Sequence, residues 1–261
     1  MLLLALTPVF KVRLGREPRE RRLWVLSAAL NFCLSYGIIY WAEQWVPSGL
    51  SSVLFATFPL MTAGVAHFAL PGERLRPSSL VGVLVGFLGV AVIFSEDFQA
   101  LGGPQVAFAA AVMLISPLSA AFGSVSIKKW GQGIHPLSLS AMPMAITAVV
   151  MGGLAFLLEA DRTVRFDRAS VLSLLYLAVF GSAITFTIYF WLLKGLPATK
   201  LSLFNYATPV VAVAVGSLWL DEPVTLRILL GTALVVAGVA WAVRTKSSNQ
   251  TPYEGICDDG S

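Results

Sequence analysis

The sequence predicts an all-α integral membrane protein built as an inverted repeat of two five-helix units, and three observations support that prediction. Hydrophobic residues make up 57% of the 261 residues and charged residues only 12%. These are too few charges to cover a water-soluble globule of this size. Long apolar stretches follow one another along the whole chain. The Pro, Trp, Glu and Gly positions of the first half return about 150 residues later. Such a return indicates an internal repeat.

The apolar stretches set the number of membrane spans, since a helix needs about 20 apolar residues to cross the hydrocarbon core. Eight stretches meet or approach this length: 23–42, 48–70, 78–95, 104–127, 136–158, 169–193, 201–220 and 223–243. The opening run 1–10 is apolar but short, and it lacks the basic n-region and small-residue cleavage site of a signal peptide. We interpret it as a stub, the end of a helix whose beginning is absent from this sequence.

The repeat is carried by residue types that an apolar composition alone does not align. A displacement of 150 positions relates one set of first-half residues to the second half, namely Trp41, Pro47, Ser52 and Pro59 to Trp191, Pro197, Ser202 and Pro209. A displacement of 149 positions relates a second set, namely Glu73, Leu80, Gly82, Gly89, Val90 and Ala91 to Glu222, Leu229, Gly231, Gly238, Val239 and Ala240. One single-residue gap reconciles the two sets. The repeat predicts a first unit at 1–95, a second at 104–243 and a polar tail at 244–261.

Loop charges predict the orientation of the chain. If the spans alternate through the bilayer, 14 of the 18 basic residues fall on one side together with the tail. By the positive-inside rule this side is cytoplasmic, in a bacterial-type inner membrane. Glu73 then lies inside whereas its repeat mate Glu222 lies outside. The two halves are therefore inverted about an axis in the membrane plane, a common construction of transporters.

Polar residues within the spans are the candidate site residues, because polar groups are costly in the hydrocarbon core. Tyr36, Tyr40 and Glu43 share one helix face. Asn31 and Ser35 form a neighbouring pair with a spacing of four. This face either lines a solute path or anchors the helix at the interface, where aromatic residues also collect.

The second half carries a corresponding polar stripe. Ser182, Thr185 and Tyr189 share one face of the repeat-related helix, and Ser119 belongs to a serine cluster in the span 104–127. Asn205 stands shortly before Pro209, a pattern that predicts an interrupted helix whose freed carbonyls need partners. Helix packing is the alternative for these side chains, since hydroxyls can bond to their own helix.

Other patterns favour structural roles. Gly82, Gly86 and Gly89 have the spacing of close helix contacts in membranes. Glu73 and Glu222 are expected to cap the helices that begin after them. The sequence shows no protease, hydrolase or nucleotide-binding motif and no metal-ligand cluster, which argues against an enzyme and against a cofactor. The basic residues lie in short loops, so the net charge of +4 does not indicate a nucleic-acid partner.

At this point the chain resembles a known family. The segments 30–60, 70–90 and 196–240, with their proline, glutamate and glycine punctuation, are similar to the EamA family of the drug/metabolite transporter superfamily. The resemblance implies a ten-helix carrier of two inverted EamA repeats with cytoplasmic termini, usually exporting amino acids or other small metabolites. This sequence departs from that pattern by lacking the first helix and most of the second, which leaves about eight full spans and the stub.

The functional prediction follows from the repeat and the stripes. We expect a carrier that moves a small organic solute across the bilayer by alternating access. Its cavity is predicted to be lined by Tyr36, Tyr40, Ser119, Ser182, Tyr189 and Asn205. The alternative is a truncated, non-transporting membrane partner or scaffold.

Several properties of such a carrier stay open in the sequence. Specificity is expected where the repeats differ, at Phe55 against Asn205 and at Ile39 against Tyr189. Amino acids, aromatic metabolites and lipophilic cations all fit the stripes. Proton coupling would depend on Glu43, His67 or the symmetric pair Glu73 and Glu222. Facilitated diffusion or exchange fits as well, and the oligomeric state is left open.

Overall fold

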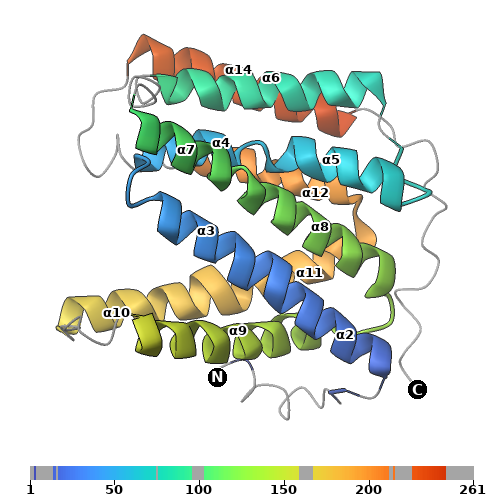
Figure 1. Ribbon diagram of the computed structural model, residues 1–261. Coiled ribbons are helices and arrows are strands. Elements are labelled where there is room, and N and C mark those ends of the chain that lie inside the picture. The colour runs from blue at the N-terminus through green and yellow to red at the C-terminus, as the bar shows by residue number, and fades with distance from the viewer. Residues whose placement is uncertain are drawn as a thin grey trace.

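The protein is a bundle of apolar helices. The computed structural model describes residues 3, 14–15, 17–74, 76–95, 103–158, 167–211, 214 and 225–244, and regular structure in this part of the chain is helical. Six helices are long and apolar enough to cross a membrane, and a further helix, Pro77–Ile93, is somewhat shorter. The spans run along one common direction (Figure 1). This arrangement confirms the predicted all-α membrane fold.

Several spans are composed of more than one helical segment. In chain order the elements are α2 (Pro18–Ser27), η1 (Ala28–Leu34), α3 (Ser35–Ala42), α4 (Ser48–Phe55), α5 (Phe58–Ala69), α6 (Pro77–Ile93), α7 (Pro104–Met113), α8 (Ile115–Trp130), α9 (Pro136–Leu158), α10 (Arg168–Tyr176), η3 (Leu177–Ile184), α11 (Thr185–Gly195), α12 (Ala198–Ser202), η4 (Leu203–Tyr206) and α14 (Leu226–Arg244). Prolines stand in the first turns of α2, α6 and α7. A proline is favourable there because the first amides of a helix have no carbonyl partner within it.

Two predicted spans differ from their expected form. The stretch 48–70 is broken at Ala56 and Thr57, where α4 ends before α5 begins. The stretch 201–220 begins as α12, tightens into the 3₁₀ turn η4 and becomes helical again at residues 207–211. The second break confirms the interruption predicted ahead of Pro209. Most of the stub 1–10 and Glu222 lie outside the described residues.

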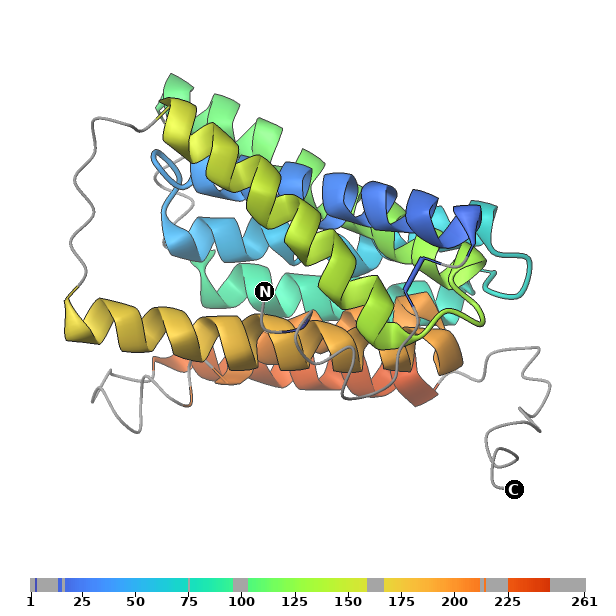
Figure 2. The same cartoon turned by 90° about the horizontal axis from the view of Figure 1, so that it is seen from below.

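Helices α6 and α14 pair along one edge of the bundle, as Figures 1 and 2 both show. Their glycines let the two backbones touch. A Cβ built on Gly82 would lie 2.7 Å from the carbonyl oxygen of Gly238, and one on Gly231 would lie 2.7 Å from that of Gly89. Only glycine fits at such distances, which is the small-residue packing expected of helices in membranes.

These glycine contacts reveal the symmetry of the fold. A displacement of 149 residues converts Gly82 into Gly231 and Gly89 into Gly238, so the contact of Gly82 with Gly238 becomes that of Gly231 with Gly89. Each contact is therefore the image of the other. Because residues early in α6 meet residues late in α14, the repeat mates run antiparallel. This is the geometry of an inverted repeat.

The two ends of the bundle are packed differently. At the end where α2 begins and α5, α8 and α11 finish, called here the α2 end, one buried cluster joins all these elements (Figure 1). Its largest fully buried members include Phe190, Leu139 and Leu193. At the opposite end, called the α10 end, a smaller cluster of described residues around Leu50 and Met113 joins α3, α4 and α7 with the intervening turn. The side chains of α10 that are described are exposed.

Candidate functional site

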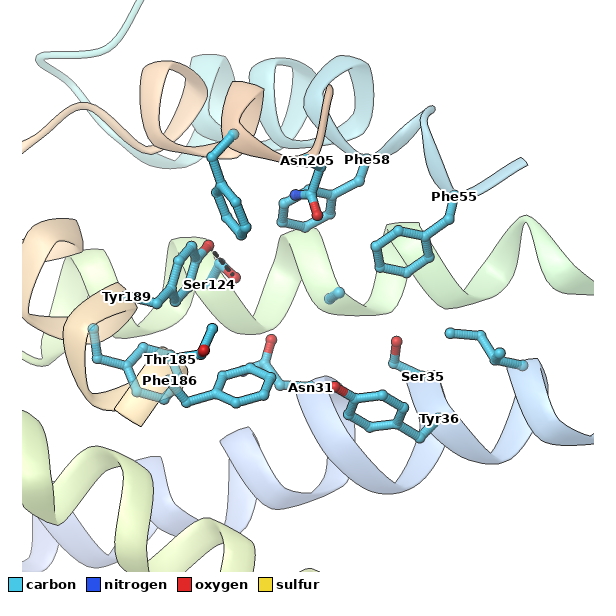
Figure 3. Close-up of a pocket in the computed structure, with 14 residues that line it drawn as sticks. Asn31, Ser35, Tyr36, Phe55, Phe58, Ser124, Thr185, Phe186, Tyr189 and Asn205 are labelled. Carbon is cyan, nitrogen blue, oxygen red and sulfur yellow. Dashed lines mark hydrogen bonds between the residues drawn. The ribbon is translucent and has the colours of Figure 1, made fainter. Parts of the chain in front are cut away.

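A pocket of about 300 Å³ lies between the two halves of the protein (Figure 3). Its size is at the lower end of the range for small-molecule sites. The lining residues come from η1, α3, α4, α5, α8, α11 and η4, so both repeats contribute. They are Asn31, Ser35, Tyr36, Ile39, Phe55, Phe58, Ala120, Ser124, Thr185, Phe186, Tyr189, Phe190, Phe204 and Asn205.

Four pairs of these lining residues are repeat mates. Under the displacement of 150 residues, Ser35, Tyr36, Ile39 and Phe55 correspond to Thr185, Phe186, Tyr189 and Asn205. The pocket is thus assembled from equivalent places in the two halves, and the side chains differ within each pair. The positions expected to determine specificity, Phe55 with Asn205 and Ile39 with Tyr189, all line it.

Two π-helical segments place the lining residues of the long spans. The α-helix resumes at Ser35 after η1 and at Thr185 after η3, and these two positions are repeat mates. A π-turn inserts an extra residue and thereby rotates the side chains that follow, and such turns are frequent at functional sites. The break in helix geometry is therefore shared by both halves and lies directly before the pocket residues.

Extra hydroxyl donors support the carbonyls of these π-segments. Ser119 donates to the carbonyl oxygen of Leu30 at 2.7 Å, and Thr185 donates to that of Phe180 at 2.6 Å. Leu30 and Phe180 are themselves repeat mates. A carbonyl left short of a partner by an irregular turn is costly in an apolar medium, so these hydroxyls stabilise the irregular geometry.

The first-half wall of the pocket is held by buried polar contacts. The side-chain amide of Asn31 donates to Ser27 at 3.1 Å, and the hydroxyls of Ser35 and Ser116 share a hydrogen bond of 2.9 Å. Asn31 also packs directly against Gly123, where a Cβ would collide with its amide group. These contacts fix η1 and α3 against α8.

The second-half wall is fixed in a similar way. The hydroxyl of Tyr189 donates to Ser124 at 3.0 Å, and the amide of Asn205 donates to the carbonyl oxygen of Ser202 at 3.1 Å. Tyr206, the next residue, is fully buried and donates to the carbonyl oxygen of Val83 in α6 at 3.1 Å. This anchor holds η4 while Asn205 reaches toward the cavity (Figure 3).

Aromatic rings form much of the remaining surface of the pocket. Phe55 and Phe58 are stacked with centroids 5.8 Å apart, and Tyr189 lies 5.7 Å from Phe204. Of the fourteen lining residues, none carries a formal charge. The pocket is therefore an aromatic chamber with isolated hydrogen-bonding groups.

The residues predicted for the cavity fall into two groups. Tyr36, Tyr189 and Asn205 line the pocket. Tyr40 stacks on Tyr36 at 6.2 Å but is 70% exposed and lies beyond the lining set. Ser119 and Ser182 are also outside it, and Ser119 bonds instead to the backbone of η1.

Of the groups considered for proton coupling, Glu43, His67 and Glu73 do not line the pocket, and Glu222 lies outside the described residues. Glu43 is exposed at the end of α3, and His67 lies in the last turn of α5 beside the ring of Phe68. Four phenylalanines that the sequence reasoning did not assign to the site do line it: Phe58, Phe186, Phe190 and Phe204. The sequence pointed to one of them only through the repeat, which pairs Phe186 with the predicted site residue Tyr36.

Glu73 corrects an expectation about helix capping. We expected it to cap the helix that follows it, but its carboxylate accepts the backbone amide of Ala198 at 2.7 Å, at the start of α12. Burial raises the pKa of this carboxyl, while nearby Lys128 and the amides of Ala198 and Thr199 lower it in part. The acid of one half thus caps a helix of the other, which a linear reading of the sequence does not show.

Lys128 completes the closure of the α2 end. Its ammonium group donates to the carbonyl oxygens of Lys194 at 2.9 Å and Leu196 at 2.8 Å, where α11 finishes. Cations near a helix C-terminus complement its dipole. Together with Glu73, this contact fastens α8 and the loop before α6 to the α11–α12 connection.

A chain with several membrane spans, two inverted halves and a chamber between them has the construction of a membrane transport protein. The chain belongs to the EamA-like transporter family, whose profile matches residues 1–95 and 107–244. This membership bears out the resemblance seen in the sequence.

Individual relatives agree with the family. "Uncharacterized transporter YvbV" of Bacillus subtilis is 29% identical over 250 residues, covering 96% of this chain and 79% of that protein. "Probable amino-acid metabolite efflux pump" of Escherichia coli is 26% identical over 231 residues, covering 80% of this chain and 75% of that protein. A solved crystal structure with 21% identity superposes with a TM-score of 0.81 over 92% of this chain and 81% of the other. The last comparison supports the fold alone.

Proposed function

We propose that this protein carries a small organic solute across a bacterial-type inner membrane by alternating access, with the aromatic chamber as the solute site. The observation that supports this most strongly is the origin of the chamber. It is built from repeat-equivalent positions of two inverted halves, at the level where both long spans leave regular α-helix. A binding site on such a pseudo-symmetry axis can be reached from either face when the halves exchange conformations.

The mechanism follows from the unequal packing of the two ends. At the α2 end, the large buried cluster, the Glu73 cap and the Lys128 bonds close the path between the halves. At the α10 end, the described residues form only the smaller cluster around Leu50 and Met113, and Tyr36 remains 38% exposed at the chamber. In this proposal, the solute enters and leaves the chamber at the α10 end in the state described here. Transfer requires the α2 end to loosen while the α10 end packs.

The loop charges orient this cycle. Most of the basic residues belong to loops at the α2 end, which the positive-inside rule assigns to the cytoplasm together with the C-terminal tail. The state described here is accordingly outward-facing. One relative is named a probable amino-acid metabolite efflux pump, so amino acids are the first solutes to examine.

Solute exchange in proteoliposomes tests the proposal. The full chain is reconstituted, loaded with a mixture of unlabelled aliphatic amino acids and assayed for uptake of each labelled one. We expect uptake above empty liposomes for at least one solute, and a loss of about tenfold or more in Tyr36→Ala and in Asn205→Ala, since each removes a chamber wall.

Tyr176→Ala provides the matched control, because Tyr176 is 62% exposed on α10 and lies outside the lining set. Its uptake should equal that of the wild type. Unchanged uptake in both chamber variants would show that transport does not pass through this pocket.

A further inference from the structure

The carbonyl groups of the two π-segments receive their extra hydrogen bonds from different places. In the second half, the hydroxyl of Thr185 donates to the carbonyl oxygen of Phe180, five residues earlier in the same span. In the first half, the equivalent carbonyl oxygen of Leu30 accepts its hydrogen bond from Ser119 of α8, at 2.7 Å. Because α8 belongs to the second half, the carbonyl of Leu30 depends on a donor that crosses between the halves.

A donor within the same span is present for this carbonyl but is engaged elsewhere. Ser35 is the repeat mate of Thr185 and stands five residues after Leu30, the spacing that Thr185 uses in the second half. Its hydroxyl instead shares a hydrogen bond of 2.9 Å with Ser116, one turn before Ser119 on α8. All three serines are buried. The first half therefore makes two hydroxyl contacts with α8, where the second half makes one contact within its own span.

This difference between the halves bears on alternating access. The two access states of inverted repeats are related by the pseudo-two-fold axis, so each half takes in one state the conformation that its mate has in the other. In the opposite state, the first half should adopt the arrangement of the second half, in which a hydroxyl of the same span serves the carbonyl. Thr185 reaches its carbonyl at 2.6 Å, so a side chain at this position is close enough to do so.

We propose that Ser119 and Ser35 are positioning residues that replace each other at the carbonyl oxygen of Leu30 during transport. In the state described here, Ser119 donates to this oxygen and Ser35 bonds to Ser116, which fastens η1 and α3 to α8. In the opposite state, Ser35 donates to it and α8 is released. This inference rests on the proposed function and names the contact between the halves that its cycle breaks.

The energetics favour a replacement over a simple break. A buried carbonyl that loses its donor in an apolar medium is costly, because no water replaces the lost hydrogen bond. Ser116 and Ser119 do not have this difficulty, since a serine hydroxyl in a helix can donate to a carbonyl of its own preceding turn. The carbonyl of Leu30 is thus the group that needs a new partner when α8 moves, and Ser35 is placed to supply it.

The replacement connects the movement of the halves with the chamber. Asn31 directly follows Leu30 and Tyr36 directly follows Ser35, and both line the chamber from the same span (Figure 3). When η1 and α3 separate from α8, the first-half wall of the chamber moves with them. The serines themselves stay behind this wall and position the residues that face the solute.

Thiol labelling at the α2 end measures how often that end opens. Leu193 is buried in the cluster of the α2 end, so Leu193→Cys reacts with a water-soluble maleimide when the cluster opens. Cys33 and Cys257 are replaced by serine in this parent, and the full chain is studied in lipid nanodiscs. The labelling rate of each further variant is compared with that of the parent.

The two positioning serines should have opposite effects. Ser119→Ala removes the donor of the state described here and should raise the labelling rate about fivefold. Ser35→Ala removes the donor of the opposite state and should lower the rate about fivefold. Fivefold corresponds to about 1 kcal/mol, the net contribution of one hydrogen bond. Variants that merely loosened the bundle would instead both be labelled faster.

Two further variants support the comparison. Ser140→Ala is the matched control, because Ser140 is also buried but donates to Pro136 of its own helix at 3.1 Å, and its labelling rate should equal that of the parent. Ser116→Ala releases the hydroxyl of Ser35 and leaves the bond from Ser119 intact. It should raise the rate, and it provides the same test if Ser119→Ala does not fold.

The possible outcomes separate this inference from the proposed function. Shifts in the same direction in Ser35→Ala and Ser119→Ala, or no shift in either, would overturn the replacement at Leu30. Amino-acid uptake that is lost in Tyr36→Ala and Asn205→Ala would then still support the proposed function. Opposite shifts in labelling without uptake of any amino acid would support the replacement and count against the proposed solute.

Discussion

The close contact of α6 with α14 allows one perturbation to be worked out quantitatively. Gly238→Ala adds a single methyl group that would lie 2.8 Å from the Cα of Gly86. Carbon atoms approach comfortably at about 3.5 Å, so the helices must separate by at least roughly 0.7 Å at this point. The backbone nitrogen of Gly86 and the carbonyl oxygen of Gly82 lie still closer to the added methyl group. A gap of that size forfeits about a quarter to a half of the dispersion energy along the contact.

The expected cost is therefore at the upper end of that for overpacking, about 3 kcal/mol. For a domain of this size such a loss lowers the melting temperature by roughly 6–12 °C. The measurement is thermal unfolding of the purified protein in one detergent, monitored by size-exclusion chromatography with fluorescence detection. The inverted repeat adds a second expectation, since Gly89 is the repeat mate of Gly238 and a Cβ built on it would lie 2.6 Å from the backbone nitrogen of Val235. Gly89→Ala should have a similar effect.

A matched control lies elsewhere in the bundle. Among the described residues, no atom outside its own helix turn lies within 4 Å of a Cβ built on Gly152 in α9, so Gly152→Ala should leave the melting temperature unchanged or slightly raised. The double variant of Gly89 and Gly238 should cost less than the sum, because the first methyl group already separates the helices. If Gly238→Ala melted like Gly152→Ala, the α6–α14 contact could not be as close as described.

Three further predictions concern individual polar contacts. Tyr206→Phe removes the buried hydrogen bond to the carbonyl oxygen of Val83 and should destabilise the protein by about 1 kcal/mol, measured as a melting temperature against Tyr176→Phe. For Glu73, the raised pKa means that the folded protein favours the protonated carboxyl. The stability of the wild type relative to Glu73→Gln should then be greatest below the ordinary carboxyl pKa and should fall as pH rises through the raised value, and a constant difference between pH 4 and 8 would contradict this. Lys128→Met removes two charge-assisted bonds and should lower stability by about 2 kcal/mol; an unchanged melting temperature would show that these bonds do not hold the α2 end closed.

The fold could be predicted from the internal repeat of the sequence more than from its hydropathy. The displaced Pro, Trp and Gly residues predicted the repeat, and the loop charges predicted its inversion. The contacts of Gly82 and Gly231 show how the two halves meet. Hydropathy located the spans but not their irregularities. The π-segments Ala28–Leu34 and Leu177–Ile184 have no proline to mark them, because their stability depends on hydroxyl donors such as Ser119 that come from another span.

The site was predictable to the extent that it follows the repeat. Tyr36 and Tyr189 were chosen from polar stripes and Asn205 from its place ahead of Pro209, and all three line the chamber. Ser119 was chosen from a serine cluster, but it donates to the carbonyl oxygen of Leu30, and Ser182 lies within η3, where the π-turn changes the direction of the side chains. The aromatic wall was missed for a different reason, since phenylalanines in an apolar span are indistinguishable from lipid-facing residues until their neighbours are known.

Accessibility of the chamber from both faces of the membrane is the most direct test of a carrier. The sequence has two cysteines, Cys33 and Cys257, which can be replaced to give an unreactive background for Asn205→Cys. A membrane-impermeant maleimide is applied to intact cells in one experiment and to inside-out vesicles in another. Alternating access predicts that the introduced thiol is labelled from each face in turn. Labelling from one face only, under all conditions of added solute, would contradict the account.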